Sequence, residues 1–240
     1  MLRRLLTVRG RFVAAVAGAA LTLSFAPFGL WWLAPLLLAV LFLLIEGAPG
    51  RERALRGFWF GFGAFATGTY WLYISIHDFG GVAPPIAVAI CGALILLMAV
   101  YLAAWGYLSG LVAPREPAWQ FLAVLPATWV GVEWLRGWLF SGFPWLSLGY
   151  GQIDGPLSAW APVVGVHGVS LLLALAAGAL TVLLLGPNRA RIAGLTVLAG
   201  GIALTALLTG RTWTAPVGEA LQVALVQGGI SQDRKWLLEE

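Results

Sequence analysis

Leu135-Arg-Gly-Trp-Leu-Phe-Ser-Gly-Phe-Pro-Trp-Leu-Ser-Leu-Gly-Tyr-Gly-Gln-Ile-Asp-Gly-Pro156 is the stretch that indicates most about the fold of this chain. It separates two strongly apolar segments, and its Gly and Pro content is too high for another membrane-spanning helix. It nevertheless carries the aromatic residues Trp138, Phe140, Phe143, Trp145 and Tyr150. Aromatic rings with a polar edge favour the boundary between membrane and water. The stretch therefore predicts a shaped surface segment at the level of the lipid headgroups.

The composition is that of an integral membrane protein. Of the 240 residues, 60% are hydrophobic and only 10% are charged, whereas a soluble domain has about 25% charged residues. The net charge is +4, but the basic residues lie in loops and form no stripe, so we expect no nucleic-acid partner. The single cysteine, Cys91, lies in an apolar run and is expected to be a packing group. The sequence contains no cysteine-based metal site and no nucleotide-binding loop, so no metal and no cofactor is expected.

Seven apolar runs approach the length of about 20 residues that a helix needs to cross the hydrocarbon core. They cover residues 10–27, 30–46, 56–76, 86–112, 118–135, 162–186 and 190–210. The first two are short and meet at Ala26-Pro27-Phe28-Gly29, a turn signal, so the division between them is open. The sequence thus predicts an all-α polytopic membrane bundle of about seven transmembrane helices over residues 1–211. Gly57…Gly61 and Gly106…Gly110 have the small-residue spacing that is typical of close helix contacts.

The distribution of Lys and Arg predicts the orientation of this bundle, because cytoplasmic loops carry an excess of both. One side has ten of the 14 basic residues, namely Arg3, Arg4, Arg9, Arg11, Arg51, Arg53, Arg56, Arg115, Arg189 and Arg191. The other side has Arg136, Arg211, Arg234 and Lys235. We therefore expect a cytoplasmic N-terminus and an extracytoplasmic C-terminal segment. Seven of the ten acidic residues then lie on the outer side, where polar chemistry is expected.

The character of the chain changes after Arg211. Residues 213–218 have the composition of a linker, and Ala220-Leu-Gln-Val-Ala-Leu-Val-Gln227 is a short apolar run between glycines. Such a run is consistent with a buried strand, although its periodicity alone does not distinguish a strand from a buried helix. Ser231 is a candidate helix cap. One strand and the start of a helix cannot bury a core, so residues 212–240 predict the incomplete beginning of an extracytoplasmic α/β domain.

Glu133 and Arg136 are the most informative charged residues in the apolar half of the chain. They are three residues apart at the outer end of the fifth run and can lie on one helix face. Charges at membrane depth are costly and often functional. Two interpretations remain open: binding of a phospholipid headgroup or amine, and an interfacial ion pair that anchors the helix.

Three other polar groups have weaker signals. His77-Asp78 has the residue types of an acid–base pair, but adjacent side chains usually point apart, and a loop role is the simpler reading. His167 and Ser170 have the types of a hydrolase pair, but no Gly-x-Ser-x-Gly is present, so roles in packing or at the start of a helix are expected. Asp154 is expected to be a turn residue.

Several motifs, in order along nearly the whole chain, resemble one family. They are Ser24-Phe-Ala-Pro-Phe28, Trp71-Leu-Tyr-Ile-Ser-Ile76 with Phe79-Gly-Gly81, Glu133-Trp-Leu-Arg-Gly-Trp138, Ser141-Gly-Phe-Pro-Trp-Leu146, Gly149-Tyr-Gly-Gln-Ile-Asp-Gly-Pro156, and Val226-Gln-Gly-Gly-Ile-Ser-Gln232 with Lys235-Trp236. The chain resembles the apolipoprotein N-acyltransferases of bacterial inner membranes. The stretch from Glu133 to Pro156 is the most specific part of the resemblance.

The resemblance implies a transferase that acts in lipoprotein maturation. Family members take an acyl chain from a phospholipid, hold it as a thioester on a cysteine, and pass it to the N-terminal amino group of a diacylglyceryl-modified apolipoprotein. A Glu, a Lys and a Cys of a nitrilase-like domain, of the carbon–nitrogen hydrolase type, do this chemistry. This sequence ends before those positions, and Cys91 does not match the nucleophile. We therefore expect no catalytic residue within the chain, which would be a fragment or a truncated form that is inactive by itself.

The residues that can be carried over from the family are accessory. Glu133, Arg136, Pro144, Trp145 and Tyr150 match the outer membrane segment over which lipid acyl chains reach the active site. Gln227, with Gly228, matches the turn at the end of the opening strand of the nitrilase-like domain, and Trp236 matches a tryptophan at the edge of its cavity. A non-catalytic lipid-binding or scaffolding membrane protein is the alternative. A transporter is disfavoured because the apolar runs contain few ionisable groups.

Overall fold

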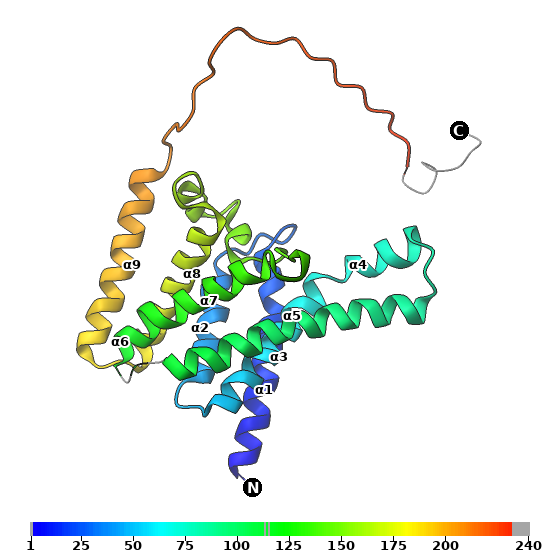
Figure 1. Cartoon of the computed structure of the whole chain (residues 1–240). Helices are drawn as coiled ribbons and strands as arrows, with labels where there is room; N and C mark the ends of the chain where they lie inside the picture. Colours follow the sequence, from blue (N-terminus) through cyan, green and yellow to red (C-terminus); the bar gives the residue numbers. More distant parts are fainter. Residues whose placement is uncertain (1, 113, 115, 232–240) are drawn as a thin grey trace.

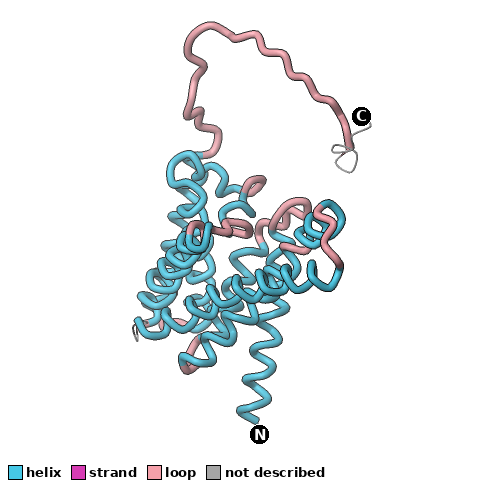
Figure 2. The backbone as a smooth tube through the Cα atoms, turned by 45° about the vertical axis from the view of Figure 1, so that its right-hand side comes forward, coloured by secondary structure: helices cyan, strands magenta, loops and turns pink. Residues whose placement is uncertain are grey.

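The computed structural model of the chain describes residues 2–112, 114 and 116–231, and this part is a bundle of α-helices (Figure 1). The long helices are α1 Leu2–Leu21, α2 Leu33–Ile45, α3 Gly50–Gly68, α5 Pro84–Val112, α7 Leu125–Arg136, α8 Ala161–Leu185 and α9 Asn188–Leu208. Two short helices are α4 Trp71–Ile74 and α6 Pro117–Trp119. Single 3-10 turns cover Thr22–Ser24, Leu139–Ser141, Leu148–Gln152 and Pro156–Trp160, and π-helical turns cover Ser75–Phe79 and Gln120–Val124. Figure 2 shows the same helices from a second direction, and all the described residues lie in helices or loops.

Each of the seven predicted apolar runs contains a helix, but two of them are divided differently from the prediction. The third run was predicted to continue to residue 76. Instead, α3 ends at Gly68, and α4 and the π-helical turn Ser75–Phe79 follow as separate elements. The fifth run begins as α6 and a π-helical turn before α7. Pro126 in the first turn of α7 explains this irregularity, because proline has no N–H to donate to the preceding turn.

The apolar helices make the described chain an α-helical membrane domain. Among the described residues, three segments are long and apolar enough to cross a bilayer, Pro84–Val112, Pro156–Leu185 and Asn188–Leu208, and Leu33–Ile45 is a shorter apolar helix. α1 and α3 are less apolar overall because each begins with several basic residues. Large apolar side chains such as Ile86, Leu195 and Ile202 are exposed on the helix surfaces, as expected where lipid replaces water.

α3 packs closely against α1 and α5. A methyl group added at Gly57 would lie 2.2 Å from the carbonyl oxygen of Leu102, and one at Gly106 would lie 2.4 Å from that of Arg53. The close helix contacts expected at these glycines are therefore confirmed, and the structure shows that the partners are α3 and α5, whose backbones approach directly at the small residues. Next to this contact, Trp105 stacks with Phe42 and meets Trp129 edge to face at 5.1 Å.

The connections between helices collect at two ends of the bundle (Figure 1). The N-terminus, residues 46–49 and residues 186–187 lie at one end, where Arg11 and Glu52 form an ion pair at 2.5 Å. The hydrogen bond from Arg11, with the nearby arginine charges adding and burial opposing, lowers the pKa of the Glu52 carboxyl. The turn after α1, the α4 region, residues 137–160 and the start of the C-terminal segment lie at the other end.

The segment after α9 extends away from the helices (Figure 1). Residues 220–227, the predicted strand, have no regular secondary structure, and their side chains are exposed. A strand needs a partner for its backbone hydrogen bonds, and none of the described residues pairs with this segment. The strand therefore stays a prediction. Trp236, predicted to lie near an active-site cavity, falls outside the described residues.

Candidate functional site

Glu133 is a buried carboxylate that joins three elements at the end of the bundle that carries residues 137–160. Its Oε2 accepts hydrogen bonds from the backbone N–H of Leu148 at 3.0 Å and from Nε1 of Trp129 at 3.3 Å. Its Oε1 accepts a hydrogen bond from Oγ of Ser170 at 2.5 Å. The side chain is 4% exposed. A buried carboxylate is stable only when it is well hydrogen-bonded, and here its donors come from α7, α8 and the loop between them.

Arg136, one helical turn after Glu133, binds residues of the same loop that precede Leu148. Its guanidinium donates to the carbonyl oxygens of Phe143 and Trp145, the second at 2.6 Å, and to Oγ of Ser147 at 3.3 Å. Its Cζ also lies 5.2 Å from the centre of the Phe65 ring, within the range of a cation–π contact. Like Glu133, Arg136 is buried.

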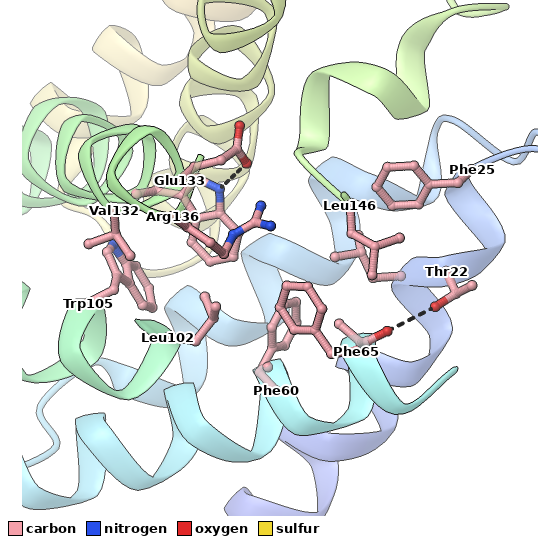
Figure 3. A pocket seen from close by; sticks show the side chains of 14 residues that line it. Thr22, Phe25, Phe60, Phe65, Leu102, Trp105, Val132, Glu133, Arg136 and Leu146 are labelled. Atoms are coloured by element: carbon pink, nitrogen blue, oxygen red, sulfur yellow. Dashed lines mark hydrogen bonds between the residues drawn. The ribbon is translucent and has the colours of Figure 1, made fainter. Parts of the chain in front are cut away.

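The two charged residues do not pair with each other within the described chain. Figure 3 shows both charged groups on the side of α7 that faces Leu146, but no ion pair of 4 Å or less joins them among the described residues. The predicted interfacial ion pair is therefore not formed. Instead, each residue binds the backbone of the loop that follows, and together they fix residues 143–148 against the helix end.

The loop itself has a strained backbone. Phe140, Ser141 and Leu146 all have positive φ angles, which L-residues with a side chain rarely adopt. Gly142 has φ +76, and a Cβ there would lie 2.1 Å from the carbonyl oxygen of Gly137, so only glycine fits. Strain of this kind persists only where surrounding contacts over-determine the conformation, and the Glu133 and Arg136 hydrogen bonds supply such contacts.

The strained backbone at Leu146 directs its side chain into the bundle. Its side chain points down among the helices, beside Phe65 and Arg136 (Figure 3). A Cβ at Gly68 would lie 2.5 Å from Cδ1 of Leu146. The last residue of α3 is therefore a glycine where the inserted leucine needs room. The cavity that remains here is about 30 Å³, room for roughly one water.

The surface of the loop presents the predicted aromatic residues together. Trp145 stacks on Phe143 at 5.0 Å and lies 6.0 Å from Trp71 of α4, and it is 49% exposed. Pro144 and Tyr150 line one hollow of about 270 Å³. Other residues of this hollow are Trp134, Gly137, Trp138, Ser147, Val166 and His167. The structure therefore brings Glu133, Arg136, Pro144, Trp145 and Tyr150 to one region, with the two charges inside and the rings outside.

Gln227 lies apart from this region. It is exposed in the extended segment after α9, which leads away from the loop in Figure 1. Within the described residues, no group of three His, Cys, Asp or Glu side chains could hold a metal ion.

The weaker candidates have structural partners. Ser170 is buried, donates to Glu133 and accepts from the N–H of Gly149 at 2.9 Å, which fits the predicted packing role. His167 Nδ1 lies 3.8 Å from the Glu133 carboxylate. His77 was predicted to lie in a loop, but it lies in the π-helical turn Ser75–Phe79, and its Nδ1 contacts the carbonyl oxygen of Val82 at 2.8 Å.

Two residues of the site were missed at the level of sequence. Ser147 accepts from Arg136 and donates to the carbonyl oxygen of Pro144. Gln152 is buried, and its Nε2 donates to the carbonyl oxygen of Trp31 at 3.2 Å, joining the loop to the turn after α1. The only signal in the sequence was that each of the two is a polar residue inside an aromatic stretch. This signal becomes informative only when the burial of the side chain is known.

Comparison with known proteins identifies the family. The sequence family model of the apolipoprotein N-acyltransferase N-terminal domain matches residues 17–179. The apolipoprotein N-acyltransferase of Azotobacter vinelandii is 43% identical over 231 residues, which cover 95% of this chain and 45% of that protein. Those of Pseudomonas aeruginosa strain LESB58 and Photobacterium profundum are 40% and 39% identical, over 95% and 96% of this chain and 45% and 44% of their own lengths. The chain spans somewhat less than half the length of these curated relatives. It belongs to the apolipoprotein N-acyltransferase family.

Proposed function

We propose that this chain is the membrane domain of an N-acyltransferase that completes lipoprotein maturation. In this reaction an acyl chain passes from a phospholipid to the N-terminal amino group of a diacylglyceryl-modified apolipoprotein, through a thioester on the enzyme. The observation that carries the proposal is the family membership, with about 40% identity over 95% of the chain. The loop between α7 and α8, residues 137–160, is held by Glu133 and Arg136 and is called the aromatic loop. It supports the proposal physically, because two lipid substrates need a half-buried apolar surface at the membrane boundary.

We place the reacting groups outside this chain. Residues 1–211 form the transmembrane domain, and residues 212–240 begin an extracytoplasmic domain of the carbon–nitrogen hydrolase type. The Glu, Lys and Cys of the reaction belong beyond residue 240. The greater length of the relatives supports this division, since the chain matches only 45% of the first of them.

The proposed topology has seven crossings of the bacterial inner membrane, with the N-terminus in the cytoplasm. The separation of the connections into two ends of the bundle supports it (Figure 1). The excess of basic residues at the N-terminal end gives the direction.

The proposed lipid-contact residues are the exposed members of the loop, Pro144, Trp145 and Tyr150. Glu133 and Arg136 position them without touching lipid. Gln227 and Trp236 belong near the active site of the complete enzyme. Trp145 has the most direct role, because its indole is half-exposed and supported from behind by Phe143 and Trp71.

The test measures acyl transfer by the complete protein, purified from the organism that produces it. The protein is mixed with phospholipid vesicles and a synthetic peptide that begins with diacylglyceryl-cysteine, and the peptide mass is followed. The expected product is heavier by one acyl group, carried as an amide on the N-terminus. Absence of both this product and an acyl-thioester on the protein would overturn the proposal and favour the non-catalytic lipid-binding alternative.

A further inference from the structure

His167 has a buried ring nitrogen that makes no hydrogen bond. Its Nδ1 is buried without a partner among the described residues. The nearest anionic atom, Oε1 of Glu133, lies 3.8 Å away, beyond the ~2.7–3.2 Å of a hydrogen bond from nitrogen. The side chain as a whole is 36% exposed and lines the same hollow as Tyr150. A buried polar atom without a partner costs free energy, which a small movement of the ring toward Glu133 would recover.

Glu133 has room for one more donor. Its three hydrogen bonds come from the hydroxyl of Ser170, the backbone N–H of Leu148 and the indole N–H of Trp129. The two N–H groups donate only, so this set of partners suits an ionised carboxylate. Such a carboxylate has roughly four acceptor positions. The ring of His167 is placed to supply the fourth donor.

The elements that pack against α8 present one anion to His167. Glu133 of α7 is that anion, and Arg136 of α7 donates its guanidinium to the carbonyl oxygens of the aromatic loop. Tyr150 is the other titratable group of the hollow. The remaining charged residues of these elements lie elsewhere, Asp154 and Arg211 in a different hollow and Arg189 and Arg191 at the opposite end of α9. The charge of a protonated His167 would therefore be balanced mainly by Glu133.

α8 is broken two residues before His167. Gly165 has φ +64 and ψ −176 within the helix, a conformation that is essentially restricted to glycine. The aromatic loop contacts α8 directly after this break. The backbone N–H of Gly149 donates to Oγ of Ser170 at 2.9 Å, and a Cβ at Gly149 would lie 2.2 Å from the carbonyl oxygen of Val166. A shift of the helical turn that carries His167 therefore changes the position of the loop.

We propose that His167 is a positioning residue whose protonated ring closes onto Oε1 of Glu133 and stabilises the contact between α8 and the aromatic loop. The neutral ring leaves this contact weaker. Histidine is the side chain whose charge ordinarily changes between about pH 5 and 8. Because a cation gains a partner, the added stability is present at acidic pH and is lost as the pH rises. This pairing needs no acyl transfer, so its failure would leave the proposed function standing.

The test is limited proteolysis of residues 137–160 in the complete protein, in mild detergent, at about pH 5.5 and about pH 8. Each rate is divided by that of the denatured protein at the same pH, which removes the pH dependence of the protease. We expect the parent protein to be cleaved about two- to fivefold more slowly at the acidic pH, as for an ion pair with one partly exposed partner.

Three variants separate the charge of His167 from its size. His167→Asn keeps a nitrogen near the position of Nδ1 but never carries a charge, so its two rates should be equal and fast. His167→Lys is charged at both values, so its rates should be equal and slow. His77→Asn is the control, because His77 is the other histidine of this chain and its Nε2 lies 3.8 Å from a carboxylate oxygen of Asp78. It should behave like the parent protein.

The same pH dependence in the parent protein and in His167→Asn would overturn the proposal. So would a pH dependence that His77→Asn removes. Nitrogen NMR of the parent protein with labelled histidine tests the protonation without any substitution. The ring of His167 should carry a proton on both nitrogens at about pH 5.5 and on one at about pH 8. A ring that stays neutral over this range would equally overturn the proposal.

Discussion

Replacing Arg136 by methionine tests whether a buried charge holds the aromatic loop. Methionine keeps the length of the side chain but donates no hydrogen bond. The carbonyl oxygens of Phe143 and Trp145 would lose their charged donor. A hydrogen bond from a charged group contributes about 1.5–3 kcal/mol, so the two together are worth about 3–6 kcal/mol. Removing the buried charge itself returns part of this, and we expect a net loss of about 2–4 kcal/mol.

The assay is unfolding of the purified protein in mild detergent, combined with limited proteolysis of residues 137–160. Arg136→Met should unfold more readily and be cut faster within the loop. Arg191→Met is the control, because Arg191 is exposed near the start of α9 and such surface changes usually cost within about 0.5 kcal/mol. Arg136→Lys should be intermediate, since an ammonium group keeps the charge but lacks the planar fork of guanidinium.

The reasoning would be refuted if Arg136→Met and Arg191→Met gave the same unfolding and the same rate of cleavage. That result would mean that the loop keeps its conformation through its own backbone and aromatic stacking. The strained φ angles of Phe140, Ser141 and Leu146 would then need another explanation.

Three further predictions follow from other parts of the chain. Gly57→Ala should lower the stability of the protein in detergent by about 1–3 kcal/mol, because the new methyl group overlaps the Leu102 carbonyl, whereas Gly92→Ala should not. The lowered pKa of Glu52 means that its pair with Arg11 stabilises the fold above the usual carboxyl pKa and is lost as pH falls through the lowered value. The thermal midpoint of Glu52→Gln should therefore fall less than that of the parent protein on acidification, and parallel curves would count against this. If the proposed function holds, Trp145→Ala in the complete enzyme should slow acyl transfer several-fold at limiting phospholipid with little change in unfolding, whereas Trp119→Ala at the opposite end should not. Equal acyl-donor kinetics of the two variants would exclude the proposed lipid contact.

Much of the helical framework was predictable because it depends on local properties of the chain. The length of each apolar run places a helix near it, and the small-residue spacing at Gly57 and Gly106 predicted close helix contacts there, although not that α3 and α5 are the partners. The end of α3 at Gly68 was not predictable in this way. It depends on the room that Leu146 needs, and Leu146 lies 78 residues later in the chain.

The sequence alone determined that the chain is an α-helical membrane domain, the approximate places of its helices and the position of the aromatic loop, because hydrophobic length and interfacial aromatics act within a short stretch of chain. It also placed Glu133 and Arg136 one turn apart on one helix. Only the tertiary structure decided what these two charges bind. Their partners are backbone groups and hydroxyls of Leu148, Ser170 and residues 143–147, and the path of a strained loop decides which of these come within reach.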